Sequence, residues 1–170
     1  MQKIGLFYAS STGNTKGAAK MIKEQLGDAE ITMYDIASCS QEDMNQYDYL
    51  IIGTSTWGEG DLQDDLEEFF PKLEAIDFST KTVALFGFGD QEQYCDYYLD
   101  AMGILYEAVV KQGAKVVGSW PTDGYGYEES KAVVDGEFVG LALDADNQDD
   151  MTNERISMWA QQIAPYFKVA

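Results

Sequence analysis

Short apolar runs alternate along this chain with segments whose apolar residues recur at helical spacing. The runs are rich in β-branched and aromatic residues, as strands are, and they cover residues 3–9, 30–36, 49–54, 82–87, 115–120 and 138–143. The helical stripes are Ala18, Ala19, Ile22 and Leu26; Leu62, Leu66, Phe69 and Leu73; Met102, Leu105 and Val109; and Ile156, Trp159, Ile163 and Phe167. The pattern predicts strand followed by helix, repeated along the chain.

The runs at 49–54 and 82–87 are apolar without clean alternation, which is typical of parallel strands covered by helices on both faces. The pattern therefore predicts a doubly wound α/β fold. The segment 121–137, rich in Gly, Asp, Tyr and Glu, separates two strand candidates and is interpreted as an inserted surface loop. Without a repeat or linker, we expect a single domain over residues 1–170.

The charge balance narrows the choice of partners. Thirty acidic and 11 basic residues give a formal net charge of −19, which repels nucleic acid and anionic lipid surfaces. Such a field attracts positively charged proteins, although acidity also serves solubility alone. Because no apolar run is long enough to span a membrane and no signal-peptide pattern opens the chain, we expect a cytoplasmic protein without membrane insertion.

The chain has no histidine, which removes the commonest general base and disfavours hydrolases of the Ser-His or Cys-His type. Its two cysteines, Cys39 and Cys95, lie far apart without metal-ligand spacing. We therefore expect neither a metal site nor a disulfide.

The loop after the first strand opens onto a helix and consists of Ser10, Ser11, Thr12, Gly13, Asn14 and Thr15. Backbone N–H groups at a helix start, together with hydroxyls, bind anions. Since the loop lacks the lysine of a P-loop and the glycine spacing of a dinucleotide fold, it suits one phosphate monoester that serves as an anchor. The simpler alternative is a turn and helix cap rich in Ser and Thr.

Two later loops each offer an aromatic residue. One follows the third strand and holds Ser55, Thr56, Trp57, Gly58, Glu59 and Gly60; the other follows the fourth and includes Phe88, Gly89, Asp90, Tyr94, Asp96 and Tyr97. Trp57 and Tyr94 are placed to stack on a planar ligand, although such residues also serve packing or stand on solvated loops. Gly58 allows positive φ, so the peptide after it can present either its carbonyl or its N–H to a ligand.

Together the three loops, the interrupted fifth strand and the closing 139–144 segment resemble the long-chain flavodoxins, and the resemblance covers essentially the whole chain. It implies a five-stranded parallel sheet of order 2-1-3-4-5 and FMN as cofactor. Residues 10–15 would then bind the phosphate, residues 56–60 the inner face and N5 edge of the ring, and residues 88–97 its outer face. Trp57 and Tyr94 would enclose the ring, Asp90 would lie near its pyrimidine edge, and Asp146 near the ribityl chain.

Three positions depart from the usual pattern of that family. Ser10 stands where threonine is more frequent, and it keeps the hydroxyl. Phe88 replaces a small hydroxyl residue and Tyr97 an asparagine, so only backbone contacts are expected there.

The resemblance implies a low-potential one-electron carrier, not an enzyme, that exchanges electrons as a monomer with basic-faced proteins such as a ferredoxin-NADP reductase. Aromatic rings that exclude water and nearby carboxylates would oppose full reduction of the flavin, by on the order of 100 mV for a handful of charges. One alternative is an FMN-dependent quinone reductase on the same fold. Another is a receiver domain, but Gly53 and Thr54 occupy the place of its aspartate.

Overall fold

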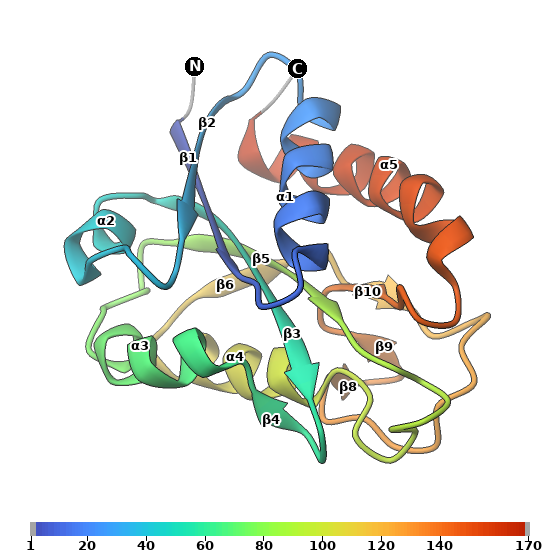
Figure 1. The fold of residues 1–170 in the computed structure, drawn as a ribbon. Coiled ribbons are helices and arrows are strands. Elements are labelled where there is room, and N and C mark those ends of the chain that lie inside the picture. The colour runs from blue at the N-terminus through green and yellow to red at the C-terminus, as the bar shows by residue number, and fades with distance from the viewer. Residues whose placement is uncertain (1–2, 169–170) are drawn as a thin grey trace.

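A parallel sheet runs through the centre of the computed structural model, which describes residues 3–168 (Figure 1). Its parallel strands are β1 (Lys3–Ala9), β2 (Glu30–Asp35), β3 (Tyr49–Trp57), β5 (Thr82–Phe88), β6 (Lys115–Val117) and β10 (Leu141–Leu143). They lie in the order β2-β1-β3-β5-β10, with β6 also paired to β5. The predicted fold and strand order are therefore confirmed.

The fifth position of the sheet is shared by two short strands. β6 pairs with residues 82–84 of β5, and β10 pairs with residues 86–88 of the same strand. The chain thus leaves the sheet after β6 and returns to the same edge as β10, as the predicted insertion in the fifth strand requires.

The insertion carries structure of its own, so the prediction of a surface loop over 121–137 was wrong in part. β7 (Trp120–Pro121), β8 (Val133–Val134) and β9 (Glu137–Phe138) form a small antiparallel sheet. Phe138 is fully buried, with the rings of Tyr98, Tyr125 and Tyr127 5.8, 5.1 and 5.4 Å away. The continuous strands predicted over 115–120 and 138–143 are each broken, because Trp120 and Phe138 belong to this small sheet.

Helices cover both faces of the parallel sheet. They are α1 (Asn14–Gln25), α2 (Gln41–Asn45), α3 (Asp64–Glu74), α4 (Asp100–Lys111) and α5 (Thr152–Ile163), with 3₁₀ turns η1 (Asp149–Met151) and η2 (Ala164–Phe167). α1 packs against α5 on one face, and α3 lies beside α4 on the other (Figure 1). α2 was not predicted because its five residues are too short for a periodic stripe; the reciprocal hydrogen bonds of Ser40 and Asp43 stabilise its first turn.

The third strand is longer than predicted and turns back on itself. β3 continues to Trp57, and β4 (Asp61–Leu62) pairs with its last residues in antiparallel register. Trp57 therefore ends a strand instead of lying in a flexible turn, and Leu62 lies in β4 instead of the predicted helix.

The core fills the spaces between the sheet and its helices. Leu50, Ile52, Leu85 and Trp159 are completely buried, and burying a large apolar side chain of this kind stabilises the fold by about 1.5–3 kcal/mol. No helix within residues 3–168 combines the length and apolarity that crossing a membrane requires. The rigid sheet holds the loops at the carboxyl ends of β1, β3, β5 and β10 at one edge of the molecule (Figure 1).

Candidate functional site

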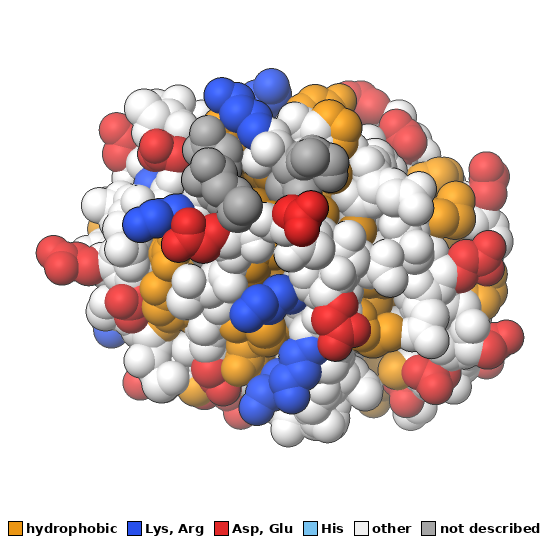
Figure 2. Space-filling view, turned by 90° about the horizontal axis from the view of Figure 1, so that it is seen from above, with side chains coloured by type: hydrophobic (Ala, Val, Ile, Leu, Met, Phe, Trp, Pro, Cys, Tyr) orange, Lys and Arg blue, Asp and Glu red, His pale blue; other side chains and the backbone are white. Residues whose placement is uncertain are grey.

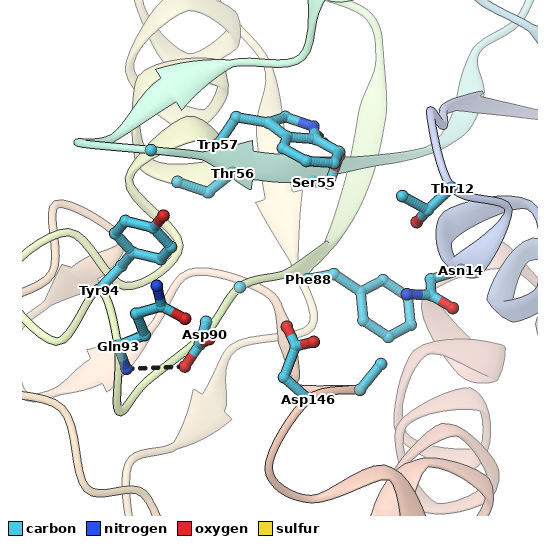
Figure 3. A pocket seen from close by; sticks show the side chains of 13 residues that line it. Thr12, Asn14, Ser55, Thr56, Trp57, Phe88, Asp90, Gln93, Tyr94 and Asp146 are labelled. Atoms are coloured by element: carbon cyan, nitrogen blue, oxygen red, sulfur yellow. Dashed lines mark hydrogen bonds between the residues drawn. The ribbon is translucent and has the colours of Figure 1, made fainter.

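A cleft of about 350 Å³ opens at the carboxyl ends of the strands (Figure 3). All three predicted loops and the turn after β10 contribute to it. Its lining residues are Thr12, Asn14, Ser55, Thr56, Trp57, Gly58, Phe88, Gly89, Asp90, Gln93, Tyr94, Ala145 and Asp146.

One end of the cleft is the start of α1. Gly13 has φ +93° and precedes the helix without a side-chain hydrogen bond to cap it, while the Ser10 hydroxyl accepts hydrogen bonds from the N–H groups of Gly13 and Lys16 at 3.1 and 3.4 Å. Thr12 and Asn14 are exposed and line the cleft. The N–H groups of Asn14 and Thr15 in the first turn therefore have no acceptor among the described residues, and two polar side chains stand beside them.

The charges around this helix start are unusual for such an acidic chain. Among residues 3–168, every other α-helix has at least one acidic residue in its first turn, whereas α1 has none. A negative group at a helix N-terminus is favourable by about 0.3–1 kcal/mol. The start of α1 thus lacks a negative partner of its own and suits an external anion.

The remaining residues of the first loop support it from within. Gln63, at the start of α3, donates a hydrogen bond from Nε2 to the Ser11 hydroxyl at 3.0 Å, and Thr15 is 1% exposed. Of the six predicted residues, Thr12 and Asn14 line the cleft, and Ser10, Ser11, Gly13 and Thr15 do not.

The second loop places an indole at the rim of the cleft. Trp57 is 40% exposed, and its Nε1–H donates to the Ser55 hydroxyl at 2.9 Å. The Thr56 hydroxyl accepts a hydrogen bond from the N–H of Ala101 in α4 at 3.1 Å, which ties the strand end to the helix. The aromatic surface of Trp57 is thus presented from an anchored strand (Figure 3).

Two glycines shape the turn between β3 and β4. Gly58 has φ +48° and lines the cleft; Gly60 has φ +87°, and a Cβ there would lie 2.7 Å from Asp100 Oδ2. Glu59 between them is exposed but does not line the cleft. The turn therefore requires glycine at both positions, for backbone conformation at Gly58 and also for space at Gly60.

The third loop is organised by Asp90. Its Oδ1 accepts hydrogen bonds from the N–H groups of Glu92 and Gln93 at 3.1 and 2.9 Å and from Asn147 Nδ2 at 2.8 Å. Partial burial pushes the pKa of Asp90 upward, but these hydrogen bonds outweigh it and hold the pKa below its ordinary value. Tyr94, 38% exposed, follows on the same turn and faces the cleft (Figure 3).

A fourth segment, after β10, adds Ala145 and Asp146 to the cleft. Partial burial and the nearby carboxylates of Asp90 and Asp144 raise the pKa of Asp146. Phe88, 7% exposed, and Gly89 line the cleft between this turn and β3 (Figure 3).

Two predicted residues face elsewhere. Asp96 and Tyr97 line a separate cleft together with residues of the insertion, because the N–H of Tyr97 donates back to the Tyr94 carbonyl and turns the chain away. Conversely, Ala145 lines the first cleft and was not predicted, and Gln93, which falls within the predicted range 88–97 but was not singled out, lines it too. Each is adjacent to a predicted residue, but neither carries a side chain that by itself indicates a ligand.

The flavodoxin family model matches residues 6–159 of this chain. The chain is 50% identical to a flavodoxin of Haemophilus influenzae over 96% of its own length and 94% of that protein. It is 51% identical to a flavodoxin of Synechocystis over 97% of its own length and 98% of that protein.

Solved structures agree with these relatives. The crystal structure of Fusobacterium nucleatum flavodoxin bound to flavin mononucleotide is 36% identical in sequence, with a TM-score of 0.94, over 98% of this chain and 99% of that one.

Proposed function

The chain belongs to the flavodoxin family, and on that premise we propose that a single domain over residues 1–170 binds FMN in the cleft and carries electrons one at a time between redox partner proteins. Bound FMN supplies a ring that accepts and releases single electrons. The chain is an electron carrier and not an enzyme.

One continuous cleft with different chemistry at its two ends supports this function. Thr12 and Asn14, beside the start of α1, line the same cleft as Trp57 and Tyr94. Helix-terminal donors suit a phosphate, and exposed aromatic side chains suit a flat ring. FMN is a ligand with both groups.

The predicted residues then take distinct parts in binding. Thr12, Asn14 and the backbone around Gly13 would hold the phosphate, with Ser10, Ser11 and Thr15 supporting that loop from within. Trp57 and Tyr94 would exclude water from the ring. Asp90 and Asp146 would lie along its polar edge and tail, whereas Asp96 and Tyr97 would act outside the cleft.

The charge distribution supports basic partners. Exposed acidic residues surround the cleft, among them Glu59, Asp61 and Glu92. At the opposite face, which carries the two termini, lysines stand among the acidic side chains (Figure 2), and Lys3 and Lys115 begin β1 and β6 there. A basic-faced protein, such as a ferredoxin-NADP reductase, is thereby steered toward the cleft end of a cytoplasmic, monomeric carrier.

Ligand titrations of the cofactor-free protein test the phosphate half of the proposal. We expect FMN to bind at least tenfold more tightly than riboflavin, because riboflavin lacks the phosphate that meets α1. Thr12→Val should weaken the binding of FMN and leave the affinity for riboflavin unchanged. Thr32→Val, at an exposed strand position outside the cleft, should change neither affinity. Equal affinities for FMN and riboflavin would contradict the proposal.

A second titration tests the partner. The rate of electron exchange with a basic-faced reductase should fall steeply as salt is raised, since exposed charges are screened within about 10 Å at 0.1 M. A rate independent of salt would exclude electrostatic steering.

A further inference from the structure

The turn after β10 contains a carboxylate without solvent exposure. Asp144 is 0% exposed and accepts five hydrogen bonds, all from N–H donors. Its Oδ1 accepts from the backbone of Asp146 and Asn147, and its Oδ2 accepts from Gln91 N, Gln91 Nε2 and Asn147 Nδ2, at distances of 2.8–3.1 Å. A buried carboxylate is stable only with such partners, so the loops that supply them are held around it.

Two side-chain amides extend this arrangement across the site. Asn147 Nδ2 donates to Asp90 Oδ1 at 2.8 Å and to Asp144 Oδ2 at 2.9 Å. Gln91, 2% exposed, donates from Nε2 to Asp144 Oδ2 at 2.8 Å and to Gln148 Oε1 at 2.9 Å. Each amide therefore uses both of its hydrogens to join the loop of Asp90 and Tyr94 to the turn after β10.

The same glutamine reaches the insertion. Gln91 Oε1 accepts a hydrogen bond from the N–H of Gly126 at 2.6 Å, and Gln148 Nε2 donates to the Gly124 carbonyl at 2.9 Å. Between them, the guanidinium of Arg155 lies 4.2 Å from the ring centre of Tyr125. The insertion is thus fastened to the third loop through Gln91 and to α5 through Arg155.

We propose that Asp144 and Gln91 are positioning residues that fix Asp90 and Tyr94 relative to Asp146 across the cleft and so connect the insertion to the flavin site. The inference rests on the proposed binding of FMN. Neither Asp144 nor Gln91 lines the cleft. They act through the residues that do, and Asp144 also adds a buried negative charge two residues before Asp146, which lines the cleft.

The test compares holo-protein variants with matched controls. Asp144→Asn keeps the size and shape of the side chain but places an NH₂ group against N–H groups that donate to the carboxylate. Donors then face donors, so the third loop should shift. FMN and riboflavin should both bind about tenfold more weakly, the ratio that about 1.4 kcal/mol represents, because the ring contacts are lost and the phosphate contacts remain. Asp150→Asn, the same charge change at an exposed residue, should leave both affinities within twofold of the wild type.

Reduction potentials separate positioning from general stability. Removing the negative charge in Asp144→Asn should make the flavin potentials less negative and change the visible spectrum of the bound flavin. Gln91→Met keeps the Asp144 charge but loses three side-chain hydrogen bonds. It should therefore weaken the binding of FMN and riboflavin without the shift in potential that loss of the charge causes. Unchanged affinities in Gln91→Met would overturn the inference.

Hydrogen exchange of the wild-type protein tests the inference even if the variants do not fold. The Gly126 N–H lies outside the cleft, yet its hydrogen-bond partner is Gln91, so FMN binding should slow its hydrogen exchange. No change there, with FMN bound, would overturn the inference. Failure of the wild type to bind FMN would instead contradict the proposed function.

Discussion

The indole Nε1–H of Trp57 donates a hydrogen bond to the hydroxyl of Ser55, two residues earlier on β3. A loop tryptophan with a free indole would sample several rotamers, and ordering it on binding would oppose affinity. Here the hydrogen bond orients the ring before the ligand arrives.

Ser55→Ala should therefore weaken FMN binding about two- to tenfold, corresponding to one hydrogen bond of about 0.5–1.5 kcal/mol. Titration by tryptophan fluorescence measures the change, and Ser157→Ala on α5, outside the cleft, is the control. An unchanged dissociation constant in Ser55→Ala would show that the hydrogen bond does not orient the indole.

The conformation of Gly58 predicts an effect on electron transfer. At φ +48° a β-branched residue is strained by about 1–2 kcal/mol, so Gly58→Val should restrict the turn that presents the following peptide to the ring. The two one-electron potentials should then lie closer together in a redox titration. Gly136→Val, at φ +83° in the turn between β8 and β9, should strain the backbone without changing the potentials; equal effects from both variants would refute the role of Gly58.

The hydrogen bond from Asn147 should affect the pKa of Asp90. Because the pKa of Asp90 is below its ordinary value in the folded protein, the carboxylate adds stability above about pH 4 that disappears as the pH falls through the folded-state pKa. Asn147→Ala removes one of its hydrogen bonds and should raise that pKa, as measured by carbon NMR of the side-chain carboxyl. A pKa that stays unchanged would mean that the backbone donors alone hold it low.

Replacing Lys81, which lies far from the cleft, should lower the stability of the fold. This side chain is 4% exposed, burial lowers its pKa, and its ammonium donates to the carbonyls of Asn45 and Tyr47. Lys81→Met keeps the apolar stem but leaves these carbonyls without that donor, so the free energy of unfolding should fall by about 2 kcal/mol or more. Urea denaturation measures it against Lys111→Met, an exposed control, and equal stabilities of the two variants would contradict the expectation.

The sequence pattern predicted the layers of the fold because periodicity is local. Runs such as 49–54 have side chains buried on both faces, and stripes such as that of Ile156, Trp159 and Ile163 face the core as expected. The pattern also predicts that the loops after the first, third and fourth strands lie at one edge, because parallel strands end together.

What the pattern missed depends on contacts between distant residues. The small sheet of the insertion forms because Tyr98, Tyr125 and Tyr127 surround Phe138, and no short run indicates that cluster. Gln91 and Asp144 are 53 positions apart, so only the folded chain shows that they meet. Asp96 and Tyr97 share a motif with Tyr94 but follow a turn that directs them to another cleft.

We expect this chain to hold one FMN whose electrons are exchanged singly. An anaerobic redox titration of the purified holo-protein, followed by its visible spectrum, tests it most directly. Since the carboxylates near the cleft would oppose the second electron, we expect two separate one-electron steps, with potentials apart by on the order of 100 mV. A single two-electron step would contradict it.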